Sequence, residues 1–371
     1  MSAPLRVLFV GLRWPPETFI LRLIAGLERR GIGVTVATRE RPSGPDAARV
    51  AWLPLPGGPA SPLGRAWRRV GPGRARRDVL PVAGFDVVYF PWNSAAIAYQ
   101  DVLGRAPAVI SCRGSQINVA PHNPERAAIR DGLAATFGRA AAVHCVSAQI
   151  RDEATRYGLD PRKAVIIHPA VDPALFRPAA APSPLRPGSP SPLRLLTTGS
   201  IIWRKGYEYA LLAVRELLDR GVAAQFDIIG DGPEGQRLRY TIHDLALQDH
   251  VTWHGACPPA EVLRRLQAAD VFLLTSLSEG ISNAVLEAMA CGLPVVTTDV
   301  DGMPEAVTDG VEGFLVPPRD PAATAGALAR LAASPDLRRT MGDAGRRRVQ
   351  RDFALDDQIA AFVDLFAGVA R

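Results

Sequence analysis

A proline-rich segment divides the chain into two stretches with similar sequence patterns. From Pro178 to Pro192, six of fifteen residues are proline. Because proline lacks a backbone N–H and fixes φ, this segment can neither pair within a sheet nor continue a helix. The sequence therefore predicts two domains, residues 1–178 and 193–350, joined by a linker at residues 179–192. With 371 residues, each domain can bury its own core.

On both sides of this linker, short β-branched runs alternate with longer amphipathic segments, which is typical of successive βα units and a mostly parallel sheet. In the first half we expect a helix at residues 17–30 and strands at residues 5–10, 34–38, 86–90, 108–112, 142–146 and 165–168. In the second half we expect strands at residues 193–198, 225–229, 250–253, 271–275 and 294–298. Helices are expected there at residues 207–219, 234–246, 259–268, 282–291, 321–333, 335–349 and 354–369. The predicted fold class is α/β, and the default ligand site is a cleft between the two domains.

Charge is distributed unevenly between the two halves. The chain carries 43 basic and 37 acidic side chains, but residues 1–178 carry 24 and 13, whereas residues 179–371 carry 19 and 24. A basic surface favours phosphates, anionic membranes or nucleic acids. Because the excess belongs to the first half alone, it indicates an anionic partner of that domain, and nucleic acid is the partner least supported.

The four cysteines are Cys112, Cys145, Cys257 and Cys291. They form no CxxC pair and have no histidine at the spacing of a metal finger, which favours reduced thiols and a cytoplasmic location. The apolar run at residues 5–11 is interrupted by Arg6 and lacks a small-residue cleavage site, so we expect no signal peptide. The apolar stretch at residues 133–150 is broken by polar residues, so we expect no transmembrane helix.

Residues 278–301 are the most informative stretch for function. Glu279 lies just before a predicted helix start, and Glu287 lies eight residues later, inside the helix. Gly280, Ile281 and Ser282 occupy the first turn, where backbone N–H groups lack intrahelical partners and the helix dipole favours negative charge. This pattern suits a diphosphate at the helix terminus, with one carboxylate on vicinal ribose hydroxyls and the other on sugar hydroxyls.

A second informative stretch is Gly199-Ser-Ile-Ile-Trp-Arg-Lys-Gly206, between a predicted strand and a predicted helix. Arg204 and Lys205 place two cations at the carboxyl end of that strand, where they can neutralise a pyrophosphate and stabilise it as it leaves. Taken alone, the pair fits a solvated helix start better than a ligand site. Taken with the two carboxylates, it favours a diphosphate site.

These motifs together resemble glycosyltransferase family 4. Glu279 and Glu287 have the family's E-x7-E spacing within EGISNAVLEAMACGLPVV. Other family-like segments are RKG at residues 204–206, GDGP at residues 230–233 and HPAVDPALF at residues 168–176. The segment PPETFI, at residues 15–20, is similar to the variant found in exopolysaccharide-assembly transferases. The resemblance covers most of the chain.

The resemblance implies a GT-B fold: two Rossmann-like domains that face each other across a cleft, with a C-terminal helix at residues 351–371 that packs back on the first domain. It also implies a retaining transferase that moves a sugar from a nucleotide sugar to a hydroxyl group of a glycan or lipid-linked acceptor. The products would be exopolysaccharides, glycolipids or related glycoconjugates. UDP-sugar is the favoured donor and GDP-sugar the alternative, with no cofactor and no metal required.

By the same resemblance, Arg204 and Lys205 hold the donor diphosphate and Glu279 lies beside the transferred sugar; these three are the expected catalytic residues. The expected donor-binding residues are Glu287, Gly280, Ile281, Ser282, Gly199, Gly230, Gly232 and His254, with Glu287 on the ribose and residues 253–257 beside the base.

One segment departs from the family pattern. The family usually has His-Gly-x-Asp after the strand at residues 108–112, and here the residues are Arg113-Gly114-Ser115-Gln116. Arg113 and Gly114, with Arg13 and Glu17, are expected on the acceptor or sugar side. Arg113 can contact an acidic sugar or a phosphate of the acceptor, or it can cap a loop; both interpretations stay open.

Other motifs give weaker signals. Residues 230–235 match G-x-G-x-x-G, with Asp249 nineteen residues after Gly230, but they follow the second strand of their domain, whereas the dinucleotide fingerprint belongs after the first. Residues 299–301 read as a loop turn rather than a metal-binding DxD. His144 reads as a satisfied core residue. Remaining alternatives are an epimerase-like GT-B enzyme, a NAD-dependent dehydrogenase and a non-catalytic nucleotide-sugar sensor.

Six arginines between Arg65 and Arg77, interleaved with Leu63 and Trp67, form a basic run in the first domain. One interpretation is a peripheral contact with anionic lipid, such as the inner face of a membrane or a lipid diphosphate acceptor. The other is a solvated loop.

Overall fold

The computed structural model describes residues 4–55, 80–179 and 192–370, which belong to two compact units. The first unit ends at Ile167 and resumes at Ile359, and the second extends from His168 to Gln358. The predicted boundary after residue 178 is therefore wrong, because Val171 and Phe176 pack into the core of the second unit. Most of the predicted linker, residues 180–191, and the basic run at residues 65–77 lie outside the described ranges.

The described strands of the first unit form a parallel sheet in the order β3-β2-β1-β4-β5-β6-β7. Their bounds are Arg6–Val10 for β1, Gly33–Thr38 for β2, Ala51–Pro54 for β3, Val87–Phe90 for β4, Ala108–Cys112 for β5, Ala142–Cys145 for β6 and Ala164–Ile166 for β7. Every residue of β4, β5 and β6 is buried. Helices cover both faces of a parallel sheet, which is why these strands read as continuous apolar runs rather than alternating ones.

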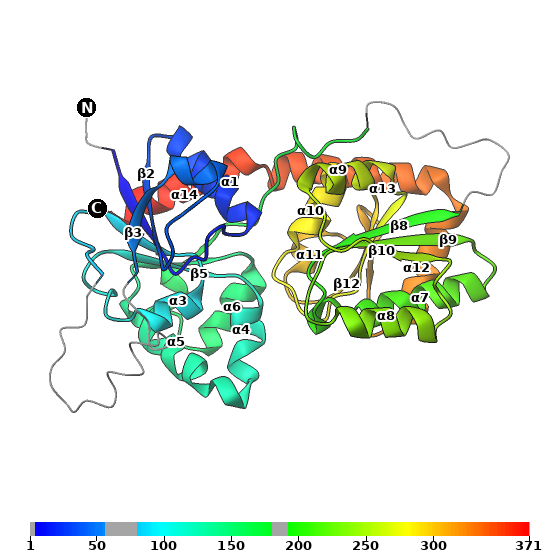
Figure 1. Ribbon diagram of the computed structural model, residues 1–371, viewed down its shortest axis with the longest axis horizontal. Coiled ribbons are helices and arrows are strands. Elements are labelled where there is room, and N and C mark those ends of the chain that lie inside the picture. The colour runs from blue at the N-terminus through cyan, green and yellow to red at the C-terminus, as the bar shows by residue number, and fades with distance from the viewer. Residues whose placement is uncertain (1–3, 56–79, 180–191, 371) are drawn as a thin grey trace. The chain divides into compact units, whose positions relative to one another are not determined.

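Helices flank this first sheet (Figure 1). One face is covered by α1, Thr18–Arg29, and by α14, Leu355–Val369. The other is covered by α3, Asn93–Ala98, α5, Ala127–Arg139, and α6, Ala148–Arg156; a short helix α4, Ser115–Asn118, follows β5. Phe362 and Phe366, one turn apart on α14, pack their rings 5.8 and 5.3 Å from that of Tyr89. The last residues of the chain thus complete the core of the first unit.

The described strands of the second unit form a parallel sheet in the order β10-β9-β8-β11-β12-β13. The strands are β8, Leu193–Thr198, β9, Ala224–Ile229, β10, Val251–Trp253, β11, Val271–Leu274, β12, Val295–Thr298, and β13, Gly313–Val316. One face packs on α7, Tyr207–Asp219, α8, Gly235–Asp244, and α12, Pro321–Ala333. The other packs on α9, Pro259–Ala268, α10, Asn283–Ala290, α11, Met303–Ala306, and α13, Pro335–Asp352. This is the expected Rossmann-like α/β architecture in both units.

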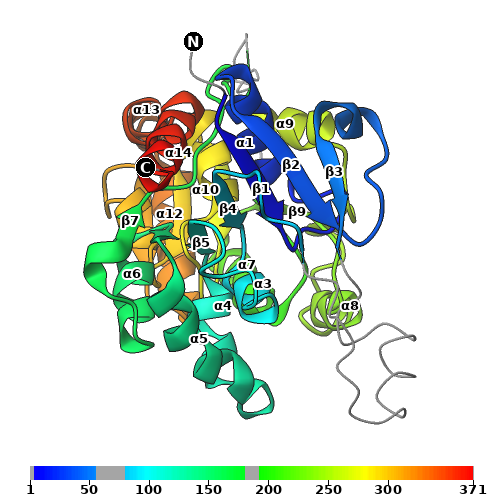
Figure 2. The ribbon, with the colours of Figure 1, turned by 90° about the vertical axis from the view of Figure 1, so that its left-hand side faces the viewer.

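Both sheets reverse their strand order once. The reversal falls between β1 and β4 in the first sheet and between β8 and β11 in the second; Figure 2 shows β2, β1 and β4 side by side. In open α/β sheets, ligands bind outside the carboxyl ends of the strands at such a reversal. The loops after β8 and β11 are therefore the first place to look for a site in the second unit.

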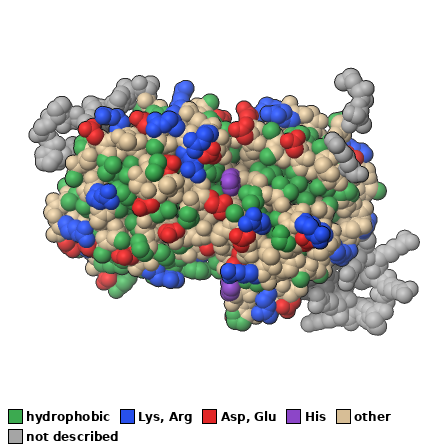
Figure 3. Space-filling model, turned by 180° about the vertical axis from the view of Figure 1, so that it is seen from behind, with side chains coloured by type: hydrophobic (Ala, Val, Ile, Leu, Met, Phe, Trp, Pro, Cys, Tyr) green, Lys and Arg blue, Asp and Glu red, His purple; other side chains and the backbone are tan. Residues whose placement is uncertain are grey.

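The outer surface mixes charges of both signs. Basic and acidic side chains are interspersed over the face seen in Figure 3. Within the described ranges, no helix combines the length and the apolar character needed to cross a bilayer.

Candidate functional site

Two loops meet at the carboxyl edge of the second sheet, where its strand order reverses. The loop after β8 ends in Gly206, which has φ +59°. Thr275 Oγ1, after β11, donates to the carbonyl oxygen of Gly206 at 2.9 Å, and Leu277 N donates to that of Arg204 at 2.7 Å. A Cβ atom on Gly206 would lie 2.3 Å from the carbonyl oxygen of Thr275. Only glycine allows the two loops to lie this close.

The contact between these loops brings two of the expected catalytic residues together. Lys205 Nζ forms an ion pair with Glu279 Oε1, and only 14% and 10% of their side chains are exposed. Ser276 Oγ, which is fully buried, donates to the same carboxylate oxygen at 2.8 Å. A largely buried carboxylate thus has both a cation and a hydroxyl group as partners.

Asp301 fixes the backbone that carries Glu279. Its Oδ2 accepts hydrogen bonds from Ser278 Oγ at 2.8 Å and from Glu279 N at 2.7 Å. Arg204, the third expected catalytic residue, reaches the same loop through Nη1, which donates to the carbonyl oxygen of Ser278 at 3.4 Å. The turn expected at residues 299–301 therefore has a positioning role that the sequence analysis missed. The available signal was that Asp301 follows β12, the neighbour of β11 in the sheet.

Tyr207, the first residue of α7, is buried beneath the loop after β8. Its hydroxyl donates to the carbonyl oxygen of Gly199 at 3.0 Å. Burial, and next the nearby Glu279 carboxylate, raise the pKa of Tyr207 well above its ordinary value. The phenol therefore stays protonated and keeps the loop after β8 in place.

Three expected donor-binding glycines lie in the same stacked loops. A Cβ atom on Gly230 would be 1.8 Å from the carbonyl oxygen of Gly199, and one on Gly232 would be 2.4 Å from that of Ile201. Gly199 itself has a positive φ of +157°. The glycines at residues 230 and 232 are thus required by the approach of the loop after β9 to the loop after β8.

The N-terminus of α10 adjoins this cluster. Gly280, Ile281 and Ser282 are buried, and the side chain of Ser282 makes no capping hydrogen bond. The first amides of α10 therefore lack the usual side-chain cap. Glu287 is partly exposed on the second turn of α10. Burial of the Cys291 thiol, and next the negative charge of nearby Glu287, raise the pKa of that thiol to about 12.

His254, also expected to bind the donor, has its imidazole engaged within the unit. Its Nε2 donates to Asp227 Oδ1 at 2.6 Å, and Arg265 Nη1 lies 2.9 Å from the same nitrogen. The side chain is therefore already committed to a carboxylate.

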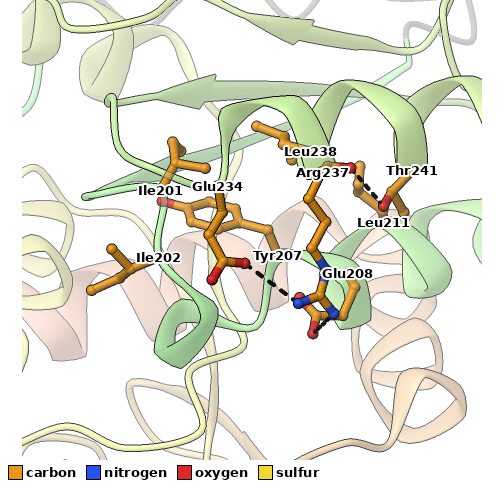
Figure 4. A pocket seen from close by; sticks show the side chains of 9 residues that line it. All are labelled: Ile201, Ile202, Tyr207, Glu208, Leu211, Glu234, Arg237, Leu238 and Thr241. Atoms are coloured by element: carbon orange, nitrogen blue, oxygen red, sulfur yellow. Dashed lines mark hydrogen bonds and ion pairs between the residues drawn. The ribbon is translucent and has the colours of Figure 1, made fainter.

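A hollow between α7 and α8 lies beside the same loops (Figure 4). Arg237 crosses it and pairs with Glu208 at 3.0 Å and with Glu234 at 3.4 Å. Two carboxylates neutralise this arginine, so the hollow is a poor site for a diphosphate compared with the Lys205 cluster.

The expected acceptor-side residues lie in the first unit. Arg113 directly follows β5; its Nη2 donates to Tyr89 Oη at 2.9 Å, and its guanidinium carbon lies 4.9 Å from the Phe19 ring centroid. Gly114 is buried with φ +90°. Arg13, in the loop after β1, and Glu17, at the start of α1, are both exposed.

Two competing motifs can be weighed against the geometry. Asp249 precedes β10, at the amino edge of the sheet, so it lies at the wrong end of the strands for a ribose bound by the loop at residues 230–235. His144 is fully buried with both ring nitrogens in hydrogen bonds, as expected for a satisfied core residue. Among the described residues, no cluster of three or more His, Cys, Asp or Glu side chains could hold a metal ion.

The reactivity of the Cys257 thiol can test whether residues 253–257 lie beside the nucleotide base, as expected from the sequence. Cys257 is partly exposed, whereas Cys112, Cys145 and Cys291 are buried, and burial raises the pKa of the Cys112 and Cys291 thiols. With a thiol reagent at about pH 8, we expect roughly one thiol per chain to react quickly, because reagents need an accessible thiolate. Cys257→Ser should abolish the fast phase, and saturating donor nucleotide should slow it in the unsubstituted chain. A fast phase that persists in Cys257→Ser would contradict this assignment.

Two family models match the chain, one over each half. The model described as "Glycosyltransferase Family 4" matches residues 16–175, and that described as "Glycosyl transferases group 1" matches residues 188–348. The second match contains the loops after β8 and β11.

Individual relatives agree with these matches. A D-inositol 3-phosphate glycosyltransferase of Streptomyces bingchenggensis is 33% identical over 261 residues, which are 67% of this chain and 57% of the relative. The amylovoran biosynthesis glycosyltransferase AmsK of Erwinia amylovora is 40% identical over 153 residues, 40% of this chain and 38% of the relative. The chain spans about half the length of the curated relatives it matches.

Solved structures share the fold over almost the whole chain. The Anabaena protein Alr3699/HepE, crystallised with UDP and glucose, superposes with a TM-score of 0.78 at 18% identity, covering 98% of this chain and 99% of that one.

Proposed function

The chain belongs to the glycosyltransferases of family 4 and group 1, and from this membership we propose that it transfers a sugar from a nucleotide-sugar donor to a hydroxyl group of an acceptor. The observation that carries the proposal is the Lys205–Glu279 pair at the strand-order reversal of the second sheet, with Arg204 on the adjoining loop. Two cations beside a helix N-terminus can take up charge as a diphosphate leaves.

The donor occupies the second unit. Arg204, Lys205 and the amides of residues 280–282 bind its diphosphate, Glu287 binds the ribose hydroxyls, and residues 253–257, His254 among them, lie beside the base. The loops that contain Gly199, Gly230 and Gly232 line the nucleotide. UDP-sugar is the favoured donor, supported by the UDP bound to the Anabaena protein of the same fold, and GDP-sugar is the alternative. No metal is needed because Arg204 and Lys205 supply the positive charge.

Lys205 has two competing partners in this mechanism. Without donor it pairs with Glu279; with donor, the diphosphate is the more highly charged acceptor. As Lys205 turns to the diphosphate, the Glu279 carboxylate, still bonded to Ser276 Oγ, gains an open lone pair for a hydroxyl of the transferred sugar. The anomeric configuration is retained by front-face attack, in which the leaving diphosphate oxygen accepts the proton of the acceptor hydroxyl. No protein nucleophile is then required.

The acceptor binds the first unit, on the side of Arg113, Gly114, Arg13 and Glu17. It is a glycan or a lipid-linked sugar, and the products are exopolysaccharides or related glycoconjugates; the name of the 40% identical Erwinia relative supports this choice. We place the enzyme in the cytoplasm, with peripheral contact to anionic lipid through residues 65–77.

A donor panel tests the proposal. UDP-, GDP- and ADP-sugars are compared first by thermal shift and then by nucleotide release with added acceptors, with and without a chelator. The expected result is stabilisation by one nucleotide class and chelator-independent release. A nicotinamide absorbance change would instead indicate a dehydrogenase, and a changed sugar without transfer an epimerase. Donor binding with no nucleotide release under any condition would indicate a non-catalytic nucleotide-sugar sensor and would refute the proposed transferase activity.

Glu287 provides a separate test of the ribose assignment. Glu287→Gln should weaken donor binding by roughly 10- to 100-fold, since it removes the charge from one or two hydrogen bonds to hydroxyl groups. Melting temperature should change little because the side chain is partly exposed. The measurement is the donor dissociation constant by calorimetry, with Glu208→Gln, on α7 at the opposite face of the sheet, as the control. Equal effects of the two substitutions would remove Glu287 from the ribose site.

A further inference from the structure

A row of hydrogen bonds crosses the first sheet beneath α14. Tyr89 on β4, Ser111 on β5 and His144 on β6 are fully buried on neighbouring strands. Tyr89 Oη lies 2.7 Å from Ser111 Oγ, and Ser111 Oγ lies 2.5 Å from His144 Nδ1. His144 Nε2 then lies 2.8 Å from the carbonyl oxygen of Ile167. At the other end, Arg113 Nη2 lies 2.9 Å from Tyr89 Oη.

When the His144 ring is neutral, the two ends of this row set the direction of every hydrogen bond in it. An arginine can only donate and a carbonyl oxygen can only accept. His144 Nε2 must therefore carry a hydrogen for Ile167, and in the neutral ring Nδ1 then accepts from the Ser111 hydroxyl. Ser111 in turn accepts from Tyr89, which leaves a lone pair of Tyr89 Oη for Arg113. The row thus presents an acceptor at one fixed position to the guanidinium.

Arg113 itself carries a charge that no described carboxylate balances. It is half-buried, its described partners are Tyr89 Oη and the Phe19 ring, and its Nε is enclosed without an acceptor. Some other partly buried arginines are paired with carboxylates, Arg265 with Glu261 at 2.7 Å and Arg348 with Asp352 at 2.7 Å. Arg346 instead donates to backbone carbonyl oxygens, a type of acceptor that no described contact gives Arg113. Withdrawing a cation from water without a counter-ion is costly. A ligand anion at Arg113 would offset that cost.

We propose that Arg113 selects acceptors that carry an anionic group, a carboxylate or a phosphate on the sugar, and that Tyr89, Ser111 and His144 are positioning residues for its guanidinium. The planar guanidinium suits both groups because it can donate two parallel hydrogen bonds. The assignment to the acceptor rests on the proposed function. The diphosphate of the donor is bound elsewhere, by the cations of the second unit.

Binding of matched sugars to the full chain tests the proposal. Glucose, galactose and mannose are each compared with their uronates and their 6-phosphates by calorimetry, with and without saturating UDP, which occupies Arg204 and Lys205. We expect at least one charged sugar to bind about tenfold or more tightly than its neutral partner, and Arg113→Gln to remove that preference. Arg113→Lys should restore part of it. Arg162→Gln, an exposed arginine paired with Asp160, should change nothing.

The uronate and 6-phosphate arms distinguish carboxylate from phosphate recognition. Tyr89→Phe separates positioning from structure: it should raise the KM for charged acceptors several-fold while kcat and neutral acceptors stay unchanged. Equal binding of charged and neutral sugars, or an unchanged preference in Arg113→Gln, would overturn the proposal. Because the calorimetric sugar comparisons need no transfer, a failure of nucleotide release would leave them unaffected and would count against the proposed function alone.

Discussion

The variant Lys205→Ala is expected to transfer sugar about 10²- to 10³-fold more slowly than the unsubstituted chain, as is usual when one group that stabilises transition-state charge is removed. Lys205 lies at the edge of the second sheet where we propose that the diphosphate departs, and no other lysine occurs in the described part of the second unit. The loss should appear mainly in kcat, because charge on the leaving group grows between substrate and transition state. The measurement is steady-state nucleotide release across donor concentrations.

Stability should change less than the rate in this variant, because a 10²- to 10³-fold loss of rate corresponds to about 2.7 to 4 kcal/mol. Lys205→Ala leaves the largely buried Glu279 without its cation but with the Ser276 hydrogen bond, so we expect a loss of about 1 to 3 kcal/mol in the free energy of unfolding. The matched control is Glu279→Gln, which keeps a hydrogen-bonding side chain and removes the charge. If Lys205→Ala turned over donor at the normal rate, the diphosphate assignment would be wrong.

Gly206→Ala is expected to be strongly destabilising. Gly206 has φ +59°, and an added Cβ would lie 2.3 Å from the carbonyl oxygen of Thr275, which is backbone and cannot rotate away. We expect a loss of more than about 3 kcal/mol in the free energy of unfolding, since the left-handed φ and the clash add. Donor binding should weaken as well, because the loop after β8 must move away from β11.

Gly221→Ala separates the two causes. Gly221 also has a positive φ, +80°, but an added Cβ would meet nothing within 4 Å. It should therefore lose only about 1 kcal/mol, the cost of a left-handed alanine. Urea unfolding of both variants, followed by circular dichroism, measures the difference. Similar losses in the two variants would show that the approach of the two loops contributes little.

Element positions could be predicted best where burial and stop signals agree. Residues 108–112, 193–198 and 207–219 were predicted to the residue, because buried parallel strands and amphipathic helices leave clear periods and Gly206 marks a boundary. The strands β3 and β13 were missed. Each has four residues, β3 ends in Pro54 and β13 begins with Gly313, so only pairing with β2 and β12 makes them strands.

The site could be predicted as a set of residues but not as a set of contacts. The motifs identified Arg204, Lys205 and Glu279, but they predicted that each of these residues contacts the ligand, not another residue of the chain. The Lys205–Glu279 ion pair joins residues 74 apart in sequence, and nothing local in either motif indicates it. Asp301 and Ser276 act only through the folded sheet edge, so their roles were missed.

The division of the first unit into two segments also governs the order in which the protein can fold as it is made. Synthesis from the N-terminus delivers residues 4–167 first, yet the face of Tyr89 and His144 stays uncovered until Phe362 and Phe366 emerge. The second unit, whose residues are contiguous, is complete before then. The nascent first unit therefore keeps this apolar face uncovered while residues 168–358 are synthesised, and a chain truncated before α14 would keep that face exposed.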